Sequence, residues 1–433
     1  MSSEPSAVTG ATGGGSVQAD VVVVGAGPGG SATAAHLARY GLEVALLEKA
    51  TFPRDKICGD GLTPRAVREL TRLGVDTSEQ AGWTHTKGLR VYGGSGRPFT
   101  MDWPDLADFP GYSLTRRRTE LDSLLAQHAV AQGAKLFTGT QVTEPVLHPL
   151  SSRISGVRTK DGRTFSAPVV VAADGNSSRL ALAMGIHRDE KRPMGVAVRS
   201  YWASPRHDDP YMESWLELWD GAPGRSRLLP GYGWIFPMGD GSVNIGLGML
   251  NTSPAFGQTD YRQLLRTWLA NTPEDWGFRD AEPLQPIQGM ALPMAFSRRP
   301  LYRDGLLLVG DAGGMVNPFN GEGIDSAMQA GRVAAGVIAD AKARGFGTSS
   351  AEHALRGYPA QMADELGKYY RLGTVFAQLI GNPTVMRVAV RYGLPRRTLM
   401  RLVHKLLAGL TDQRDGDAFD RIINALVRLA PTV

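Results

Sequence analysis

The stretch "DVVVVGAGPGG", residues 20–30, decides the fold of this chain. Its run of valines predicts a buried parallel strand, and the alanine-rich segment after it predicts a helix. Between them, Gly25, Gly27 and Gly30 have the spacing G-x-G-x-x-G. Such glycines permit a tight turn, a close approach of the backbone to a pyrophosphate, and close packing of helix on strand. The stretch therefore predicts a dinucleotide site at the start of an α/β fold.

A carboxylate follows at the end of the next predicted strand. This strand, "EVALLEK" (residues 43–49), contains Glu48, which lies about 20 residues beyond the glycines. An acid at that place accepts hydrogen bonds from the ribose hydroxyls of an adenosine and repels a 2′-phosphate. We therefore expect an adenine dinucleotide other than NADP.

Two later segments also run from an apolar strand into an acid. "VVVAADGNSS" (169–178) reaches Asp174, and "LLLVGDAGGMVNPFNGEGIDSAM" (306–328) reaches Asp311 before a predicted helix. An aspartate beyond a strand can accept hydrogen bonds from a ribityl chain, and a helix start can stabilise negative charge on a reduced ring. Together the three segments predict FAD.

The order of these motifs resembles the flavoprotein superfamily of p-hydroxybenzoate hydroxylase, over nearly the whole chain. The resemblance implies that Asp311 holds the ribityl chain, that Gly323 and Ile324 lie against the isoalloxazine ring, and that Arg118 in "RRRTELD" contacts FAD. The implied fold is α/β, with a Rossmann-like FAD-binding domain interleaved with an antiparallel-sheet substrate domain, plus C-terminal helices.

The chain departs from the hydroxylase pattern at two places. Ala181, with Arg179 nearby, stands where the central motif usually has an arginine, and Gly314 stands where the late motif usually has a histidine. Both departures argue against an NADPH-driven aromatic hydroxylase.

Two further segments resemble the geranylgeranyl reductase family. "KICGDGLTPRAV" (56–67) is similar to its lysine-x-cysteine-glycine segment, and "PGYGWIFPMGDGSVNIGLG" (230–248) to its Tyr-x-Trp-x-Phe-Pro signature. The Gly-Asp after the cysteine, in place of Gly-Gly, is similar to the bacterial menaquinone reductases within that family. The resemblance implies hydride transfer from reduced FAD to a double bond of an isoprenoid chain, in menaquinone or a geranylgeranyl compound.

The motifs and the resemblance together define the expected site. The catalytic candidates are Cys58, Tyr232 and Trp234. The expected FAD contacts are Gly25, Ala26, Gly27, Pro28, Gly29, Gly30, Glu48, Lys49, Lys56, Cys58, Gly59, Arg118, Val142, Asp174, Gly175, Gly310, Asp311, Pro318, Gly321, Gly323 and Ile324. No metal is expected, because a single cysteine excludes cysteine-ligated zinc and an iron–sulfur cluster.

Reduction of an isolated alkene also needs a proton donor near the flavin. The candidates are the thiol of Cys58, the phenol of Tyr232 and an ordered water. Burial would keep the thiol protonated, whereas Lys56 or Arg54 would favour the thiolate, so the sequence leaves the donor open.

The segment from Arg192 to Met294 alternates apolar and polar residues, which predicts an antiparallel sheet. Tyr232 and Trp234 share one face of a strand there and form an aromatic wall suited to an isoprenoid chain. The expected domains are a disordered tail (1–18), an FAD-binding domain (19–85, 110–190 and 296–345), a substrate domain (86–109 and 191–295) and a C-terminal helical region (346–433).

The segment "RRTLMRLVHKLLAGL", residues 396–410, lies in a region without acidic residues between Glu365 and Asp412. A helix there would carry its leucines on one face and Arg397, Arg401, His404 and Lys405 towards the other. Two interpretations stay open: the helix lies in the headgroups of an anionic membrane, or it packs on the body with its arginines in water.

Composition limits the remaining possibilities. Scattered charges give no nucleic-acid patch, and neither a membrane-spanning run nor a signal peptide is present, so we expect a cytoplasmic protein. Peripheral contact at the inner face of the cell membrane follows if the first interpretation of the basic helix holds. The electron donor is open between NAD(P)H, ferredoxin and a quinol. The alternatives are a flavin monooxygenase or halogenase of the same fold, and a cluster-free electron-transfer flavoprotein.

Overall fold

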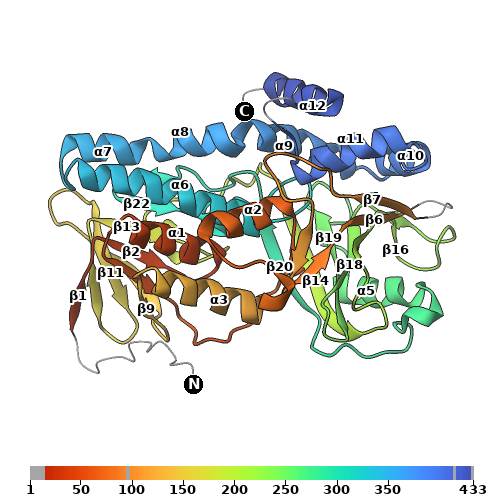
Figure 1. Cartoon of the computed structure of the whole chain (residues 1–433), viewed down its shortest axis with the longest axis horizontal. Helices are drawn as coiled ribbons and strands as arrows, with labels where there is room; N and C mark the ends of the chain where they lie inside the picture. The colour runs from red at the N-terminus through yellow and green to blue at the C-terminus, as the bar shows by residue number, and fades with distance from the viewer. Residues whose placement is uncertain (1–14, 94–97, 413–415, 431–433) are drawn as a thin grey trace.

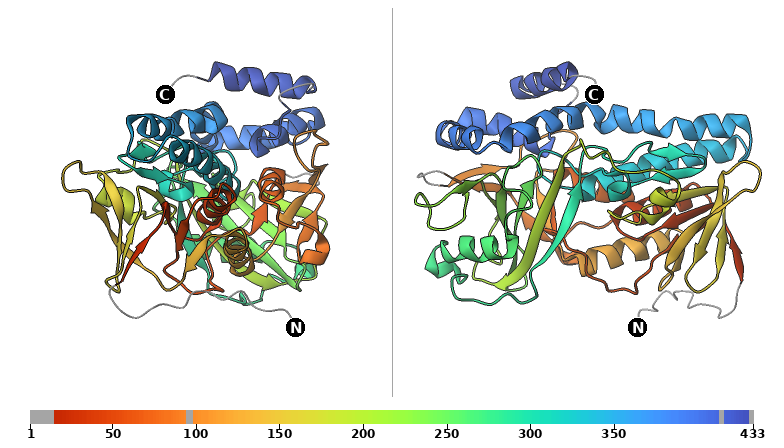
Figure 2. Two further views of the ribbon diagram at one scale, coloured as in Figure 1. Left: turned by 60° about the vertical axis from the view of Figure 1, so that its left-hand side comes forward. Right: turned by 180° about the vertical axis from the view of Figure 1, so that it is seen from behind.

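The structure is a computed structural model that describes residues 15–93, 98–412 and 416–430. A half built of helices and parallel strands carries the glycine motif, and a large antiparallel sheet forms the other half (Figure 1). Helices from the C-terminal part of the chain run along one edge of both halves (Figures 1 and 2). This arrangement confirms the predicted α/β architecture.

A six-stranded sheet of order β21-β22-β13-β2-β3-β9 carries the glycine motif. β2 is buried and pairs in parallel with β13 and β3, so Val24 lies beside Ala172 and Leu47 and these strands end at one edge. The acids that follow the strands are therefore brought together, as in other open α/β sheets. The strands are β2 (Val21–Val24), β3 (Val44–Leu47), β9 (Lys135–Phe137), β13 (Val169–Ala172), β21 (Tyr302–Arg303) and β22 (Leu306–Leu308).

Helix α1 starts directly after the glycine turn and packs between α3 and α6 (Figure 1). The α1–α6 contact is close because glycines meet there: a Cβ on Gly331 would lie 2.8 Å from the carbonyl oxygen of Gly29. The first six helices are α1 (Pro28–Arg39), α2 (Pro64–Leu73), α3 (Arg118–Ala131), α4 (Arg179–Ala183), α5 (Tyr261–Ala270) and α6 (Ile324–Ala343).

A four-stranded sheet of order β1-β12-β11-β10 contacts β13 through β11. It corrects one expectation: Ser16–Gln18, assigned to a disordered tail over 1–18, forms β1 and pairs in parallel with β12. The free edge of β12, which the local sequence does not reveal, supplies the partner; residues 1–14 lie outside the described residues. The strands are β1 (Ser16–Gln18), β10 (Val142–Leu147), β11 (Ile154–Thr159) and β12 (Thr164–Ser166).

The second half is a seven-stranded sheet of order β20-β14-β19-β18-β15-β6-β7. α5 covers one face of it, where a Cβ on Gly233 would lie 2.6 Å from the ring of Trp268. The strands are β6 (Gly88–Tyr92), β7 (Phe99–Asp102), β14 (Met194–Ala203), β15 (Tyr211–Trp215), β18 (Tyr232–Pro237), β19 (Ser242–Leu250) and β20 (Gln288–Pro293). Smaller sheets contain β4 (Gly61–Leu62), β5 (Thr84–Thr86) and β8 (Ser113–Thr115), and β16 (Leu218–Trp219) and β17 (Leu228–Leu229).

The C-terminal helices extend from α6 across to the antiparallel sheet (Figure 2). α12 lies on the outer side of α9 and α11. No helix among the described residues has the length and apolarity needed to cross a bilayer. The helices are α7 (Ser349–Arg356), α8 (Tyr358–Met362), α9 (Lys368–Ile380), α10 (Pro383–Gly393), α11 (Arg397–Ala408) and α12 (Ala418–Leu429).

The polar face predicted for residues 396–410 is only partly correct. Arg397 and Arg401 are exposed, but His404 and Lys405 are buried. Lys405 turns inward because its Nζ lies 2.6 Å from Asp420 Oδ1 of α12, an ion pair that compensates for its burial. The domain boundaries given above stay a prediction.

Candidate active site

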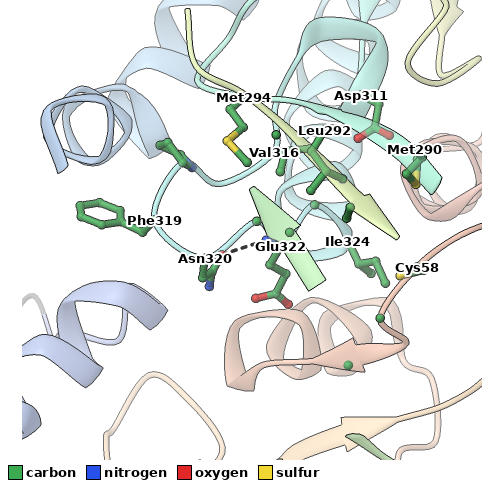
Figure 3. Close-up of a pocket in the computed structure, with 18 of the residues that line it drawn as sticks. Cys58, Met290, Leu292, Met294, Asp311, Val316, Phe319, Asn320, Glu322 and Ile324 are labelled. Carbon is green, nitrogen blue, oxygen red and sulfur yellow. Dashed lines mark hydrogen bonds between the residues drawn. The ribbon is translucent and has the colours of Figure 1, made fainter. Parts of the chain in front are cut away.

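A cavity of about 1060 Å³ extends from the glycine turn, past the antiparallel sheet, to the C-terminal helices. Most of the expected site residues line it, although they come from distant parts of the chain. Figure 3 shows three of them, Cys58, Asp311 and Ile324. Those that line it are Gly25, Gly27, Pro28, Gly29, Glu48, Lys49, Lys56, Cys58, Gly59, Arg118, Val142, Asp174, Gly175, Tyr232, Trp234, Gly310, Asp311, Pro318, Gly321, Gly323 and Ile324.

Two expected contacts, Ala26 and Gly30, do not line the cavity and instead shape the turn. The Ala26 N–H donates to Glu48 Oε2 at 3.0 Å. A Cβ on Gly30 would lie 1.8 Å from the carbonyl oxygen of Gly25, so no side chain fits there. Gly25 has φ of +100°, which favours glycine. These residues thus act on the cavity through backbone geometry.

Glu48 is held at the end of β3 by two backbone groups and one arginine. Its Oε1 accepts from the Ala50 N–H at 3.0 Å, and its Oε2 lies 3.4 Å from the Arg54 guanidinium. Arg54 also pairs with Asp122 at 2.8 Å, and Arg118 holds the same carboxylate with two hydrogen bonds of 2.7 and 2.8 Å. Glu48 and Arg118 therefore have fixed orientations beside the cavity.

The acids after the other strands have the character that FAD requires. Asp311 lines the cavity and has no ion pair among the described residues. Asp174 Oδ1 is buried and has no hydrogen-bond partner in the described part of the chain. Burial raises the pKa of Asp311, and the Lys56 ammonium opposes that rise. Unpaired carboxylate oxygens beside a glycine turn fit the hydroxyl groups of a dinucleotide cofactor.

Cys58 lines the cavity on the segment between β3 and β4, and Figure 3 shows it facing the same space as Ile324, the first residue of α6. Its sulfur accepts a hydrogen bond from the Asp60 N–H at 3.4 Å. Burial raises the pKa of the thiol, Arg118 lowers it, and Asp60 raises it further. The net effect is upward, so the group is a thiol at neutral pH.

Tyr232 and Trp234 line one wall of the cavity, as their shared strand face predicts. Their ring centroids are 5.9 Å apart. The Tyr232 O–H donates to the Asn320 carbonyl at 3.0 Å, and the Trp234 Nε1–H donates to Asn244 Oδ1 at 2.9 Å. Burial raises the pKa of Tyr232 to about 12, so its phenol stays protonated.

The far part of the cavity is apolar. β6 and β7 supply Val91 and Met101, while α10 and α11 supply Val390 and Met400, and these side chains belong to one hydrophobic cluster together with Leu394. His404 is a polar residue in this part: its ring centroid lies 4.8 Å from that of Trp103, and burial lowers its pKa to about 4, which keeps it neutral. This part of the cavity can hold a long apolar ligand.

Comparison with known proteins places the chain in a family. Residues 18–345 match the family described as "FAD binding domain". A menaquinone reductase of Mycolicibacterium smegmatis is 37% identical over 409 residues, which cover 94% of this chain and 95% of the relative. A digeranylgeranylglycerophospholipid reductase of Methanocella arvoryzae is 32% identical and covers 81% and 84%. The chain belongs to the geranylgeranyl reductase family of FAD-dependent oxidoreductases.

Membership in the geranylgeranyl reductase family confirms the predicted cofactor, which is FAD. The fold is also confirmed by a solved structure of a geranylgeranyl bacteriochlorophyll reductase-like protein from Thermoplasma acidophilum. It is 22% identical, has a TM-score of 0.75, and the match covers 95% of this chain and 100% of that one.

The structure of this geranylgeranyl reductase family member adds residues that the sequence did not single out. Glu322 lines the cavity, accepts hydrogen bonds from the Thr63 N–H at 3.1 Å and hydroxyl at 2.7 Å, and has its pKa raised by burial to about 8 (Figure 3). Its position between Gly321 and Gly323, two expected FAD contacts, could have identified it from the sequence. The Gly-Asp pair after Cys58 entered the sequence analysis only through the family resemblance, and the burial of the Asp60 side chain is new in the structure.

Proposed function

We propose that the chain is a reductase that saturates a carbon–carbon double bond in an isoprenoid chain, with the menaquinone side chain as first candidate and a geranylgeranyl group as second. The names of the two relatives support this. The observation that carries it is the cavity itself, because the part lined by the expected FAD contacts continues into an apolar part. A polyprenyl chain offers no hydrogen bonds and must be recognised by apolar contact.

The residues of the glycine turn and Glu48 would hold the dinucleotide end of FAD, and Asp311 the ribityl chain. The start of α6 at Gly323 and Ile324 would lie at the ring, and its N–H groups favour negative charge there. When bound and reduced, FAD supplies the two electrons and one hydrogen that the double bond needs. The apolar walls exclude water from that place, which protects the reduced cofactor from side reactions.

Cys58 is the proton donor in this proposal. Among the described residues its S–H has no acceptor, whereas the O–H of Tyr232 is already donated to the Asn320 carbonyl. Because its pKa is raised, the thiol stays protonated at neutral pH, as a general acid must be. Tyr232 and Trp234 then position the double bond against this thiol.

The C-terminal helices give the lipid a route into the cavity. α10 and α11 line it and expose Val388 and Tyr392, which do not line the cavity, at 52% each. Leu399 lines the cavity and is also 40% exposed. Both helices also carry exposed arginines, and no acidic residue lies on either helix. We therefore propose that this face rests on an anionic membrane, which supplies the isoprenoid substrate.

The alternatives are less well supported. A monooxygenase or halogenase shares the fold, but the relatives that match at 37% and 32% identity are reductases by name. A protein that only passes electrons to a quinone must bring the quinone ring to the flavin. It does not need an apolar cavity for the isoprenoid side chain of the quinone.

One experiment tests the proposal and both alternatives. The FAD-loaded protein is reduced without oxygen, mixed with a polyprenyl menaquinone, and the lipid is analysed by mass after its ring is reoxidised. A gain of two hydrogens that survives reoxidation supports the reductase. Ring reduction alone would support an electron carrier, and incorporation of oxygen after air is admitted would support a monooxygenase; either result would overturn the proposal.

A further inference from the structure

Asp60 is a buried carboxylate next to Cys58 that the reaction as described above does not use. Its side chain is 0% exposed, and its φ is +62°, a backbone conformation that favours glycine. A residue with a Cβ is less favourable than glycine in that conformation. Asp60 therefore stands at a position whose backbone conformation glycine would adopt more readily.

Only one of the two carboxylate oxygens has partners. Oδ2 accepts from the Tyr201 O–H and from Asn244 Nδ2, the latter at 2.9 Å. Oδ1 is buried and has no hydrogen-bond partner among the described residues. An amide oxygen at the position of Oδ2 could accept both hydrogen bonds, so these contacts do not explain why the residue is an acid.

The surroundings tie this carboxylate to the catalytic segment. Asn244 Nδ2 also donates to the Cys58 carbonyl at 2.9 Å, and Arg199 Nε donates to the same carbonyl at 3.2 Å. The Asp60 N–H donates to the Cys58 sulfur. The carboxyl and the thiol are thus linked through one set of hydrogen bonds, with Cys58 lining the cavity and Asp60 buried behind it.

We propose that Asp60 is the buried acid that returns a proton to Cys58 after each turnover. This proposal rests on the proposed function, in which the S–H bond of Cys58 breaks and its proton goes to one carbon of the double bond. The thiolate that remains takes the proton of the Asp60 carboxylic acid, so an O–H bond breaks and an S–H bond forms. Asp60 then takes a proton from solvent, which balances the cycle.

The charges around Asp60 agree with this direction of transfer. Burial raises its pKa to about 6, while hydrogen bonds from Tyr201 and Asn244 and the positive charges of Arg199 and Arg118 oppose the rise. The thiol of Cys58 has a pKa raised above its ordinary 9.0. A proton therefore moves downhill from the carboxylic acid to the thiolate, and Asp60 is a positioned acid that acts through Cys58.

The first test does not depend on catalysis. Because Cys58 is the only cysteine in the chain, alkylation of the folded, FAD-loaded protein by iodoacetamide reports on this thiol alone. In Asp60→Asn the negative charge beside the thiol is lost, so the thiol pKa should fall. We expect alkylation at pH 8 to be about 3–10 times faster, the effect of 0.5–1 pKa unit. An unchanged pH profile would overturn the proposal.

The second test separates the first turnover from later ones. In Asp60→Asn the first turnover should keep the rate of the unmodified protein, because Cys58 starts with its own proton, whereas steady-state turnover should fall about tenfold or more. Equal loss in both phases would indicate a purely structural role and overturn the proposal. If the unmodified protein reduces no isoprenoid, the proposed function fails, while the alkylation test still reports on the coupling of the two residues.

Two variants serve as controls. Asp60→Gly suits the positive φ and also lacks the carboxyl, so it should reproduce both effects if Asp60→Asn folds poorly. Asp240→Asn makes the same chemical change at a carboxylate that pairs with Arg117, whose guanidinium lies 4.2 Å from the Tyr201 ring. It should leave the alkylation profile unchanged, and a similar shift there would overturn the assignment to Asp60.

Discussion

The proposed docking of α10 and α11 on a membrane can be tested quantitatively. Arg387, Arg391, Arg397 and Arg401 are exposed on these helices. Each arginine near an anionic surface contributes about 1 kcal/mol, so replacing all four by glutamine should remove about 4 kcal/mol, or a factor of about 1,000 in the partition coefficient. The measurement is co-sedimentation with vesicles of phosphatidylglycerol and phosphatidylcholine, compared with phosphatidylcholine alone.

The matched control replaces four other exposed arginines on the antiparallel-sheet half, two of them on α5. Both variants lower the formal net charge of +5 by the same amount, so only the position of the charges differs. Equal loss of binding in the two variants would refute the assignment to α10 and α11. Equal binding of the unmodified protein to both kinds of vesicle would refute an electrostatic contribution altogether. The four arginines of the control are Arg225, Arg227, Arg262 and Arg266.

Three further predictions concern single side chains. Asp311→Ala should weaken FAD binding about 10- to 100-fold through loss of a charge-assisted hydrogen bond, measured by flavin fluorescence, and full retention of flavin would contradict the assignment. Trp234→Ala should raise KM for the isoprenoid while FAD stays bound, so a loss of flavin in this variant would speak against a substrate-wall role. His404 has a pKa of about 4 in the folded protein and 6.5 as its ordinary value, so the stability from its neutral form is complete above pH 6.5 and is lost as the pH falls towards 4. His404→Gln should therefore show a shallower fall of Tm between pH 6.5 and 4, and an identical fall would refute this.

The glycine turn and the carboxylate beside it could be predicted because their signals are local. Gly25, Gly27 and Gly30 lie within one turn, and Glu48 ends the next strand, so short-range rules suffice. The approach of Cys58 to the start of α6 depended on the family resemblance, because no property of the chain between them encodes that contact.

The apolar end of the cavity could not be predicted in the same way. α10 and α11 carry apolar residues on more than one face, so the sequence does not tell which face lines a cavity and which is exposed. The burial of Lys405 could not be predicted either, because its partner Asp420 lies on a separate helix. The unusual burial of Asp60 was equally hidden, because an aspartate in a glycine-rich segment usually marks an exposed turn.

The division of the cavity between distant stretches of the chain has an evolutionary consequence. The cofactor end is built before residue 345, whereas α9, α10 and α11 complete the apolar end. Changes after residue 345 can therefore alter the length and shape of the lipid that is accepted without disturbing the redox centre. Exchange of C-terminal segments between relatives offers a direct way to obtain reductases with new lipid preferences.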